Sequence, residues 1–207
     1  MLFRFKRGYV PLKHNIPLQK IYQWVEGLNF KEKRPWAMPE TEFKNLEAAA
    51  VFRESGIYGK TALILGTWFG SGLMPFASGT FGTLAAVPLA VLWLFFSPFS
   101  SALFLIVMVL VAIWASQVVQ SLLERVDPSE VVIDEVVGFL LTLLWIPISW
   151  GTLLAGFLLF RLFDIWKPWP AGPAERLHGG FGIVLDDLVA GLYANLGLRM
   201  ILFFVSF

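Results

Sequence analysis

Long apolar runs with few polar breaks fill residues 61–207. The stretch 61–123 contains no aspartate, glutamate, lysine, arginine or histidine. A helix that crosses a bilayer needs about 20 predominantly apolar residues, so this stretch accommodates more than one crossing. The pattern predicts spanning helices over 84–96 and 101–123, with a turn around Pro98 between them. Residues 61–70 are apolar but short, and they predict an interfacial or re-entrant helix.

The apolar pattern continues through the second half of the chain. Residues 131–168 predict a helical hairpin that is broken at 147–151, where Pro147 and Gly151 interrupt the run. A last apolar run follows Asp186 and Asp187, which are predicted to begin the final helix. The predicted fold class is therefore all-α, a polytopic membrane helical bundle of about five spanning helices plus the interfacial or re-entrant helix.

The N-terminal part differs from the rest in charge. Residues 1–60 hold eleven lysines and arginines against six glutamates, whereas residues 61–207 hold five basic and nine acidic residues. Trp24, Phe30 and Trp36 stand among the basic residues, as in a segment that lies on an anionic membrane surface, although a soluble arm fits equally well. We predict a basic cytoplasmic or interfacial extension over 1–58, with a helix at 39–55, and a membrane-embedded domain over 59–207.

Composition excludes several classes of protein. The chain is 57% hydrophobic with a mean hydropathy of +0.69, which speaks against a nucleic-acid partner. The absence of cysteine excludes disulfides, thiolate zinc sites and cysteine-nucleophile phosphatases. A phosphatase with two catalytic histidines would have to pair His14 with His178, which are far apart in the sequence. We interpret His178 as a turn residue or, alternatively, as a proton donor to a leaving group.

Ionisable residues crowd into 160–191, between two apolar runs. Residues 136–160 carry no charge, and 188–207 carry only Arg199. Charges at membrane depth are unfavourable by several kcal/mol and usually mark function. Carboxylates beside Arg161 and Lys167 suit a divalent metal and an anionic group such as phosphate, because hard cations take oxygen ligands and bridge phosphates. The alternative is an ordinary juxtamembrane loop.

The hairpin geometry brings its acids to one level. With Ser149 as the centre of the turn, Asp134 lies 15 residues before it and Asp164 lies 15 residues after it. At about 1.5 Å per residue, both stand about 22 Å from the turn, near one membrane face. A single acid there is well explained as a helix-end charge that reaches water, but a group needs a compensating cation. The predicted metal ligands are Asp134, Glu135, Asp164, Asp186 and Asp187.

Two features are candidates for binding the phosphate. Arg161 and Lys167 each lie three residues from Asp164, so all three share a helical face, and the two cations either clamp phosphate or only form ion pairs. The glycine-rich stretch 70–84 lacks the ending of a Walker loop, and it either offers backbone N–H groups to an anion or merely separates membrane helices. The predicted substrate-binding residues are Arg161, Lys167, Ser71, Gly79 and Thr80.

Four segments, taken together, resemble the phosphatidylglycerophosphatase A family. They are GSGLMPFASGTFGTLAAVP (70–88), VIDEVVG (132–138), FRLFDIWKPWP (160–170) and HGGFGIVLDDLVAG (178–191), in the family's order. The chain has Ser-Gly-Thr at 78–80 where the family typically has Pro-Gly-Thr, and Gly-Thr-Leu at 82–84 where it has Gly-Ser-Leu. The resemblance does not cover the first 55 or so residues. It implies a magnesium-dependent phosphatase of bacterial inner membranes that converts phosphatidylglycerophosphate to phosphatidylglycerol.

The residues and the resemblance lead to one mechanistic hypothesis. The acids would hold one or two Mg²⁺ ions, the cations would bind phosphate oxygens, and one acid would activate water. The site is expected at the cytoplasmic face, where it meets the lipid headgroup while the acyl chains stay among membrane lipids; an oligomer is compatible with the sequence. The predicted catalytic residues are Asp134, Asp164, Asp187 and Lys167.

The main alternative is a membrane transporter or proton relay that uses intramembrane carboxylates. Acids gathered at one face, rather than near the midplane, favour the phosphatase. A CDP-alcohol phosphotransferase would carry a DGxxAR signature, which the sequence lacks. A non-enzymatic membrane scaffold would leave the charge pattern unexplained.

Overall fold

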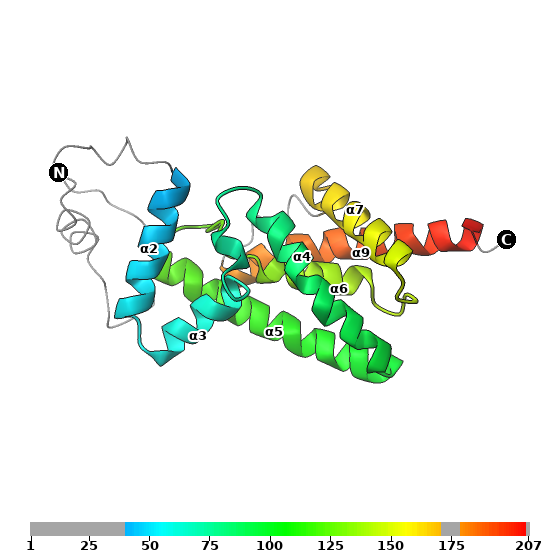
Figure 1. Ribbon diagram of the computed structural model, residues 1–207, viewed down its shortest axis with the longest axis horizontal. Helices are drawn as coiled ribbons and strands as arrows, with labels where there is room; N and C mark the ends of the chain where they lie inside the picture. Colours follow the sequence, from blue (N-terminus) through cyan, green and yellow to red (C-terminus); the bar gives the residue numbers. More distant parts are fainter. Residues whose placement is uncertain (1–39, 171–178, 206–207) are drawn as a thin grey trace. The chain divides into compact units, whose positions relative to one another are not determined.

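The computed structural model describes residues 40–170 and 179–205 of the chain. All regular elements in these ranges are helical, which confirms the predicted all-α class (Figure 1). The elements are α2 (Glu40–Glu54), α3 (Ile57–Gly66), η2 (Ser71–Leu73), α4 (Ser78–Val91), η3 (Leu92–Phe95), α5 (Pro98–Leu123), α6 (Ile133–Thr142), α7 (Trp150–Trp166) and α9 (Gly180–Val205).

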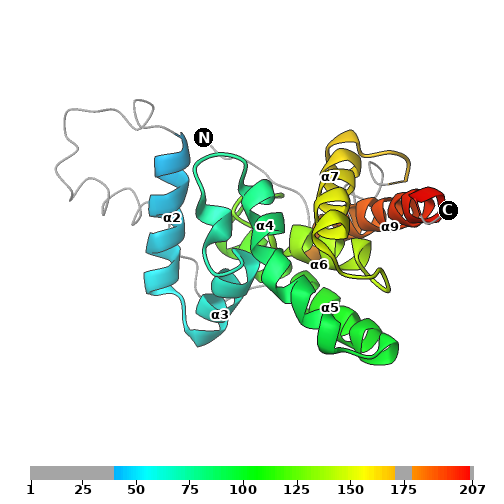
Figure 2. The ribbon, with the colours of Figure 1, turned by 45° about the vertical axis from the view of Figure 1, so that its right-hand side comes forward.

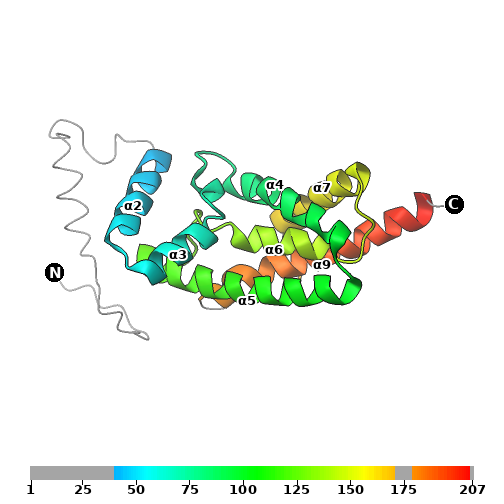
Figure 3. The same cartoon turned by 60° about the horizontal axis from the view of Figure 1, so that its bottom comes forward.

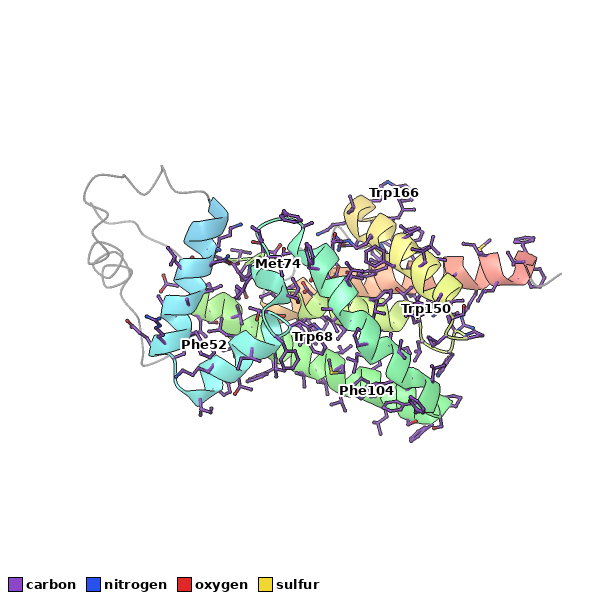
Figure 4. The ribbon with its side chains drawn as sticks, in the orientation of Figure 1. Phe52, Trp68, Met74, Phe104, Trp150 and Trp166 are labelled. Carbon is purple, nitrogen blue, oxygen red and sulfur yellow. The ribbon has the colours of Figure 1, made fainter. Side chains whose placement is uncertain are left out.

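Three helical segments are long and apolar enough to cross a membrane. They are Ser78–Phe95, which joins α4 and η3, Pro98–Leu123 and Gly180–Val205. With 17 residues, α7 is at the short end of the spanning range of about 17–25 residues. The exposed side chains of Trp150 and Trp166 mark its two ends (Figure 4), as tryptophans do at membrane–water interfaces. The helices thus agree with the predicted membrane bundle.

The short helix α6 lies at the centre of the bundle. It packs against α4, α5, α7 and α9 (Figure 3), and side chains such as Val136 and Phe139 are fully buried. Its ten residues rise about 15 Å, half of a hydrocarbon core of about 30 Å. The first arm of the predicted hairpin is therefore too short to cross a membrane, because it ends at Thr142 and not at the break predicted at 147–151.

Two polar side chains of α9 explain why α6 stops. Asn195 Nδ2 lies 2.9 Å from the carbonyl oxygen of Thr142 and 3.0 Å from that of Leu144. The guanidinium group of Arg199 donates to the Leu144 carbonyl at 3.1 Å and to Asn195 Oδ1 at 2.8 Å. The last carbonyls of a helix have no partner within it, and hydrocarbon offers none. The side chains of α9 therefore let α6 end within an apolar run of sequence.

The helix α4 begins earlier than the sequence predicts. Its first residue is Ser78 and not residue 84, because Ala77 turns the chain in a left-handed conformation (φ 49°) just before it. Half of the predicted glycine-rich loop is thus helical, and Gly79 and Thr80 lie in the first turn of α4.

The helix α9 also begins earlier than predicted. It starts at Gly180, so Asp186 and Asp187 lie about two turns inside the helix and not at its first residues. A Cβ atom on Gly180 would overlap the backbone of α5 at Ile113 and Gln117, and Gln117 Oε1 accepts a hydrogen bond from the Gly180 N–H at 2.9 Å. This glycine therefore lets α9 pack closely against α5.

The helix predicted at 39–55 is confirmed as α2, which packs against α3 and α5. Arg125 holds it in place, since its guanidinium group pairs with Glu47 of α2 and, at 2.8 Å, with Glu130. The short apolar helix predicted at 61–70 is α3, which begins and ends four residues earlier.

The N-terminal arm and His178 lie outside the described residues. The chain divides into two compact units, Met1–Met38 and Pro39–Phe207, and all described helices belong to the second. The domain boundary predicted between residues 58 and 59 stays a prediction.

The contacts that end α6 predict the effect of one substitution. Asn195→Leu should lower the free energy of unfolding by about 1–3 kcal/mol, because buried carbonyls lose their donor. Thermal unfolding in detergent measures this loss. Leu196→Ala, at a half-exposed site on the same helix, is the control. Equal melting temperatures for the two variants would contradict this account of α6.

Candidate active site

Two glycines let α6 and α9 cross in direct contact. A Cβ atom on Gly138 would lie 2.8 Å from the carbonyl oxygen of Asp187, and one on Gly191 would overlap the carbonyl group of Gly138. Gly138 is one turn after Asp134, and Gly191 is one turn after Asp187. Small residues allow helix backbones to approach closely in membranes. The crossing therefore brings the acids of the two helices together.

Three carboxylates meet beside this crossing. One oxygen each from Asp134, Glu135 and Asp187 lies within 4.8 Å of the others. Asp134 is 9% exposed and Asp187 is 4% exposed. Asp134 Oδ1 and Glu135 Oε2 are buried and accept no hydrogen bond from the described residues. Oxygen atoms in this state are suited to ligate a hard divalent cation.

The electrostatics of the cluster also call for a cation. Burial raises the pKa of the Asp134 carboxyl well above its ordinary value, and the nearby charges of Glu135 and Asp187 raise it further. Burial raises the pKa of Glu135 to about 7, although a hydrogen bond with Asp134 and the charge of Arg161 oppose the rise. Both acids belong to α6, outside the candidate spans. Three ionised carboxylates this close are unfavourable unless a positive charge joins them.

Asp164 and Arg161 reach the cluster from α7, which lies next to α6 and α9 (Figure 2). Arg161 Nη1 lies 2.6 Å from Asp164 Oδ2. The charge of Asp164 also acts on Asp187, so the two carboxyl groups lie near each other. Asp164 is thus at the site, as predicted, but it is paired with a cation and stands outside the group of three acids. The common level predicted for Asp134 and Asp164 stays a prediction, because it assumed a helix up to the turn at Ser149 whereas α6 ends at Thr142.

Lys167 and Asp186 form a second ion pair at the edge of the cluster. Lys167 Nζ donates to Asp186 Oδ2 at 2.9 Å. Lys167 ends α7 in a left-handed conformation (φ 47°), so its side chain leaves the face that carries Arg161 and Asp164 and turns towards α9. The shared face predicted for Arg161, Asp164 and Lys167 is therefore wrong for Lys167, because the helix ends there.

The first turn of α4 touches the cluster. A Cβ atom on Gly79 would overlap the carboxylate of Glu135 and would lie 3.0 Å from Arg161 Nη1. No side chain caps α4, and the first N–H groups of any helix lack partners within it. Those of Ser78, Gly79 and Thr80 are thus available beside Arg161. The partial positive charge of a helix start adds to their affinity for anions.

Ser71 differs from the other predicted substrate-binding residues. It lies in η2, and its hydroxyl donates to the carbonyl oxygen of Thr67 at 3.3 Å. No described contact joins it to the acids. The structure therefore brings Gly79 to the site, with Thr80 next to it in the first turn of α4, and leaves Ser71 in the turn before it.

Comparison with known proteins places the chain among phosphatases. The family model for phosphatidylglycerophosphatase A matches residues 64–202, about two thirds of the chain. The chain belongs to the phosphatidylglycerophosphatase A family. This membership confirms the prediction of a membrane-embedded phosphoric monoester hydrolase of phospholipid metabolism.

Three relatives cover most of the matched region. A protein of Bacteroides thetaiotaomicron, provisionally named phosphatidylinositol-3-phosphatase, is 38% identical over 64% of this chain and 87% of its own length. Phosphatidylglycerophosphatase A of Escherichia coli is 37% identical over 62% and 76%, respectively, and that of Haemophilus influenzae is 40% identical over 63% and 82%. No solved structure matches the chain significantly.

In this phosphatidylglycerophosphatase A family member, sequence reasoning missed the contacts that join the end of α6 to α9. Asn195 and Arg199, one turn apart in the apolar run that follows Asp187, were the available signal. Gly191 gave no signal of its own, because its role depends on the crossing with Gly138.

The contact between α4 and the acids predicts that Gly79→Ala lowers phosphatase activity by about 100-fold, because the added methyl group displaces Glu135 and Arg161. Phosphate release from a lipid monoester measures the loss. Gly151→Ala is the control, since a Cβ atom there meets only Ser149 Oγ, at 3.7 Å. Full activity of the Gly79→Ala protein would show that α4 does not shape the site.

Proposed function

We propose that this protein is a Mg²⁺-dependent phosphatase that hydrolyses phosphatidylglycerophosphate to phosphatidylglycerol and phosphate in phospholipid biosynthesis. The observation that carries the proposal is the meeting of three buried carboxylates with a helix start and an arginine, at Asp134, Glu135, Asp187, Gly79 and Arg161. Family membership supports the reaction, and the two relatives named phosphatidylglycerophosphatase A support the substrate.

The proposed ligands of Mg²⁺ are Asp134, Glu135 and Asp187. Their buried oxygens are the hard donors that this ion prefers. When bound, the ion neutralises charge on the phosphate and lowers the pKa of coordinated water. Asp164 and Asp186 are not among the proposed ligands. Asp164 forms an ion pair that positions Arg161, and Asp186 forms one that positions Lys167.

The proposed phosphate site lies between α4 and α7. Arg161 and the N–H groups of Gly79 and Thr80 bind the oxygens of the monoester phosphate, because their donors are fixed before the substrate arrives. Asp164 keeps the guanidinium group in place through their ion pair. Lys167 is the second cation near the leaving group.

The proposed reaction is a single displacement at phosphorus. The oxygen of a water molecule forms a bond to phosphorus while the bond between phosphorus and the ester oxygen breaks. A carboxylate of the acid cluster takes a proton from the water and returns it to the departing alkoxide. The products are phosphatidylglycerol and inorganic phosphate, and the acids end in their starting state.

The proposed orientation puts the site at the cytoplasmic face of a bacterial inner membrane. α4, α6 and α9 begin near the acids, whereas α5 and α7 end on that side. Arg125 follows the end of α5, and Arg161 and Lys167 lie at the end of α7. Among the described residues, Arg199 is the only basic residue at the opposite ends of these helices. Basic residues favour the cytoplasmic side of a membrane.

A transporter or proton relay remains the rival function. Transport carboxylates lie near the bilayer midplane and line a path through it. Asp134, Glu135 and Asp164 instead lie near helix ends and Asp187 lies about two turns into α9, next to donors for an oxyanion. The placement supports hydrolysis at a membrane surface.

Removal of single charges tests the proposed catalytic set. Asp134→Asn and Asp187→Asn should each lower phosphate release from phosphatidylglycerophosphate by at least about 1,000-fold, because each removes a metal ligand while keeping the side-chain shape. Glu124→Gln, at an exposed position, is the matched control. EDTA should stop release by the wild-type protein. Activity that persists in both aspartate variants would refute the assignment.

Metal binding can be measured without turnover. Mg²⁺ at about 100 times its dissociation constant should stabilise the wild-type protein by about 2.7 kcal/mol, and this gain should vanish in the Asp134→Asn protein. Melting temperatures with and without Mg²⁺ give the answer. An equal rise in both proteins would place the ion elsewhere.

A further inference from the structure

A separate polar cavity of about 210 Å³ adjoins the start of α4. One wall comes from α2, another from the segment between η2 and α4, and a third from the segment before α6. Met74, labelled in Figure 4, belongs to the second wall. The lining residues used below are Lys44, Asn45, Ser78, Ser129 and Glu130.

Consecutive residues of the chain connect the cavity to the proposed phosphate site. Ser78 lines the cavity, and the next residue, Gly79, abuts Glu135 and Arg161. Glu130, on another wall, lies four residues before Asp134 in the sequence. A group attached to a phosphate at Gly79 therefore has a polar space beside it into which it can extend.

Lys44 and Glu130 are the charged residues of the cavity lining. Lys44 Nζ donates to Ser129 Oγ at 3.0 Å. This hydrogen bond joins the wall from α2 to the wall from the segment before α6. Glu130 is 2% exposed, and its Oε1 pairs with Arg125. Its other oxygen, Oε2, is buried and accepts no hydrogen bond from the described residues. A buried carboxylate oxygen of this kind calls for a donor, such as a hydroxyl group.

We propose that this cavity selects the substrate by binding the part that lies between its two phosphates. Glu130 Oε2 accepts a hydrogen bond from a hydroxyl of the linker, and Lys44 binds the diester phosphate that joins this linker to the lipid. The inference rests on the proposed function. It assigns the preferred substrate to phospholipids in which a hydroxylated linker separates a monoester phosphate from a diester phosphate.

The cavity also gives α2 a role in recognition. Lys44 and Asn45 lie before residue 64, where the family match begins. Arg125 ties α2 to the cavity, because it pairs with both Glu47 and Glu130. Selection of the linker therefore depends on a helix that lies outside the matched region.

Two inhibitors separate the cavity from the monoester site. Phosphatidylglycerol keeps the linker and the diester phosphate but has no monoester, whereas inorganic phosphate matches only the monoester. In Lys44→Ala, the inhibition constant of phosphatidylglycerol should rise about tenfold and that of inorganic phosphate should not change. Conversion of labelled phosphatidylglycerophosphate in mixed micelles is the assay. Lys44→Arg, which keeps the charge, should restore most of the affinity.

Lys60→Ala is the matched control for the loss of a cation. The ammonium group of Lys60 lies 5.6 Å from the ring centre of Phe52, away from the cavity lining. Both inhibition constants should stay at their wild-type values in this variant. Phosphatidylinositol is tested in the same way, so that an inositol linker can be distinguished from glycerol. The lipid with the lower inhibition constant contains the preferred linker.

The outcomes separate this inference from the proposed function. If Lys44→Ala changed both inhibition constants equally, or neither, the cavity would not bind the linker, even with normal turnover by the wild-type protein. If the wild-type protein did not convert phosphatidylglycerophosphate, the proposed function would fail and the inference would fail with it.

Discussion

The contact between α6 and α9 is the constraint on which the rest of the site depends. Gly138 and Gly191 allow the two backbones to touch, and the acids one turn away are carried into one small volume. A larger side chain at either glycine would push the two helices apart, and the carboxylates would then move apart as well. Packing and chemistry are therefore linked at one crossing, because the same backbone approach that fills the core also concentrates negative charge.

Positive charge offsets this concentration from several directions. Arg161 and Lys167 each pair with one acid, and the start of α4 directs free N–H groups towards the same place. Among the residues that the structure describes, no cation forms an ion pair with the three central carboxylates. Side chains thus neutralise the edge of the cluster, and its centre holds three carboxylates that could bind a metal ion.

Much of the fold followed from periodicity and composition. The apolar runs predicted the helices α5 and α7 closely, and the helix predicted at 39–55 is α2. The four motifs pointed to the family that the comparison confirmed. Each of these inferences used information that is local in the sequence or repeated along it.

The errors arose where distant residues decide the structure. The end of α6 depends on Asn195 and Arg199, more than fifty residues later in the chain, so no local pattern marked it. The early start of α9 depends on Gly180 packing against α5, and a glycine beside other glycines suggests a turn when seen alone. Lys167 was assigned to a helical face that ends one residue too soon to include it.

The dependence of α6 on α9 has a consequence for how the protein is made. The carbonyls at the end of α6 lack donors until Asn195 and Arg199 have been synthesised and inserted. A ten-residue helix is too short to be held in the bilayer by its own hydrophobicity. During biogenesis α6 therefore reaches its final depth only after the last helix arrives, and the acids it carries come together at the end of assembly.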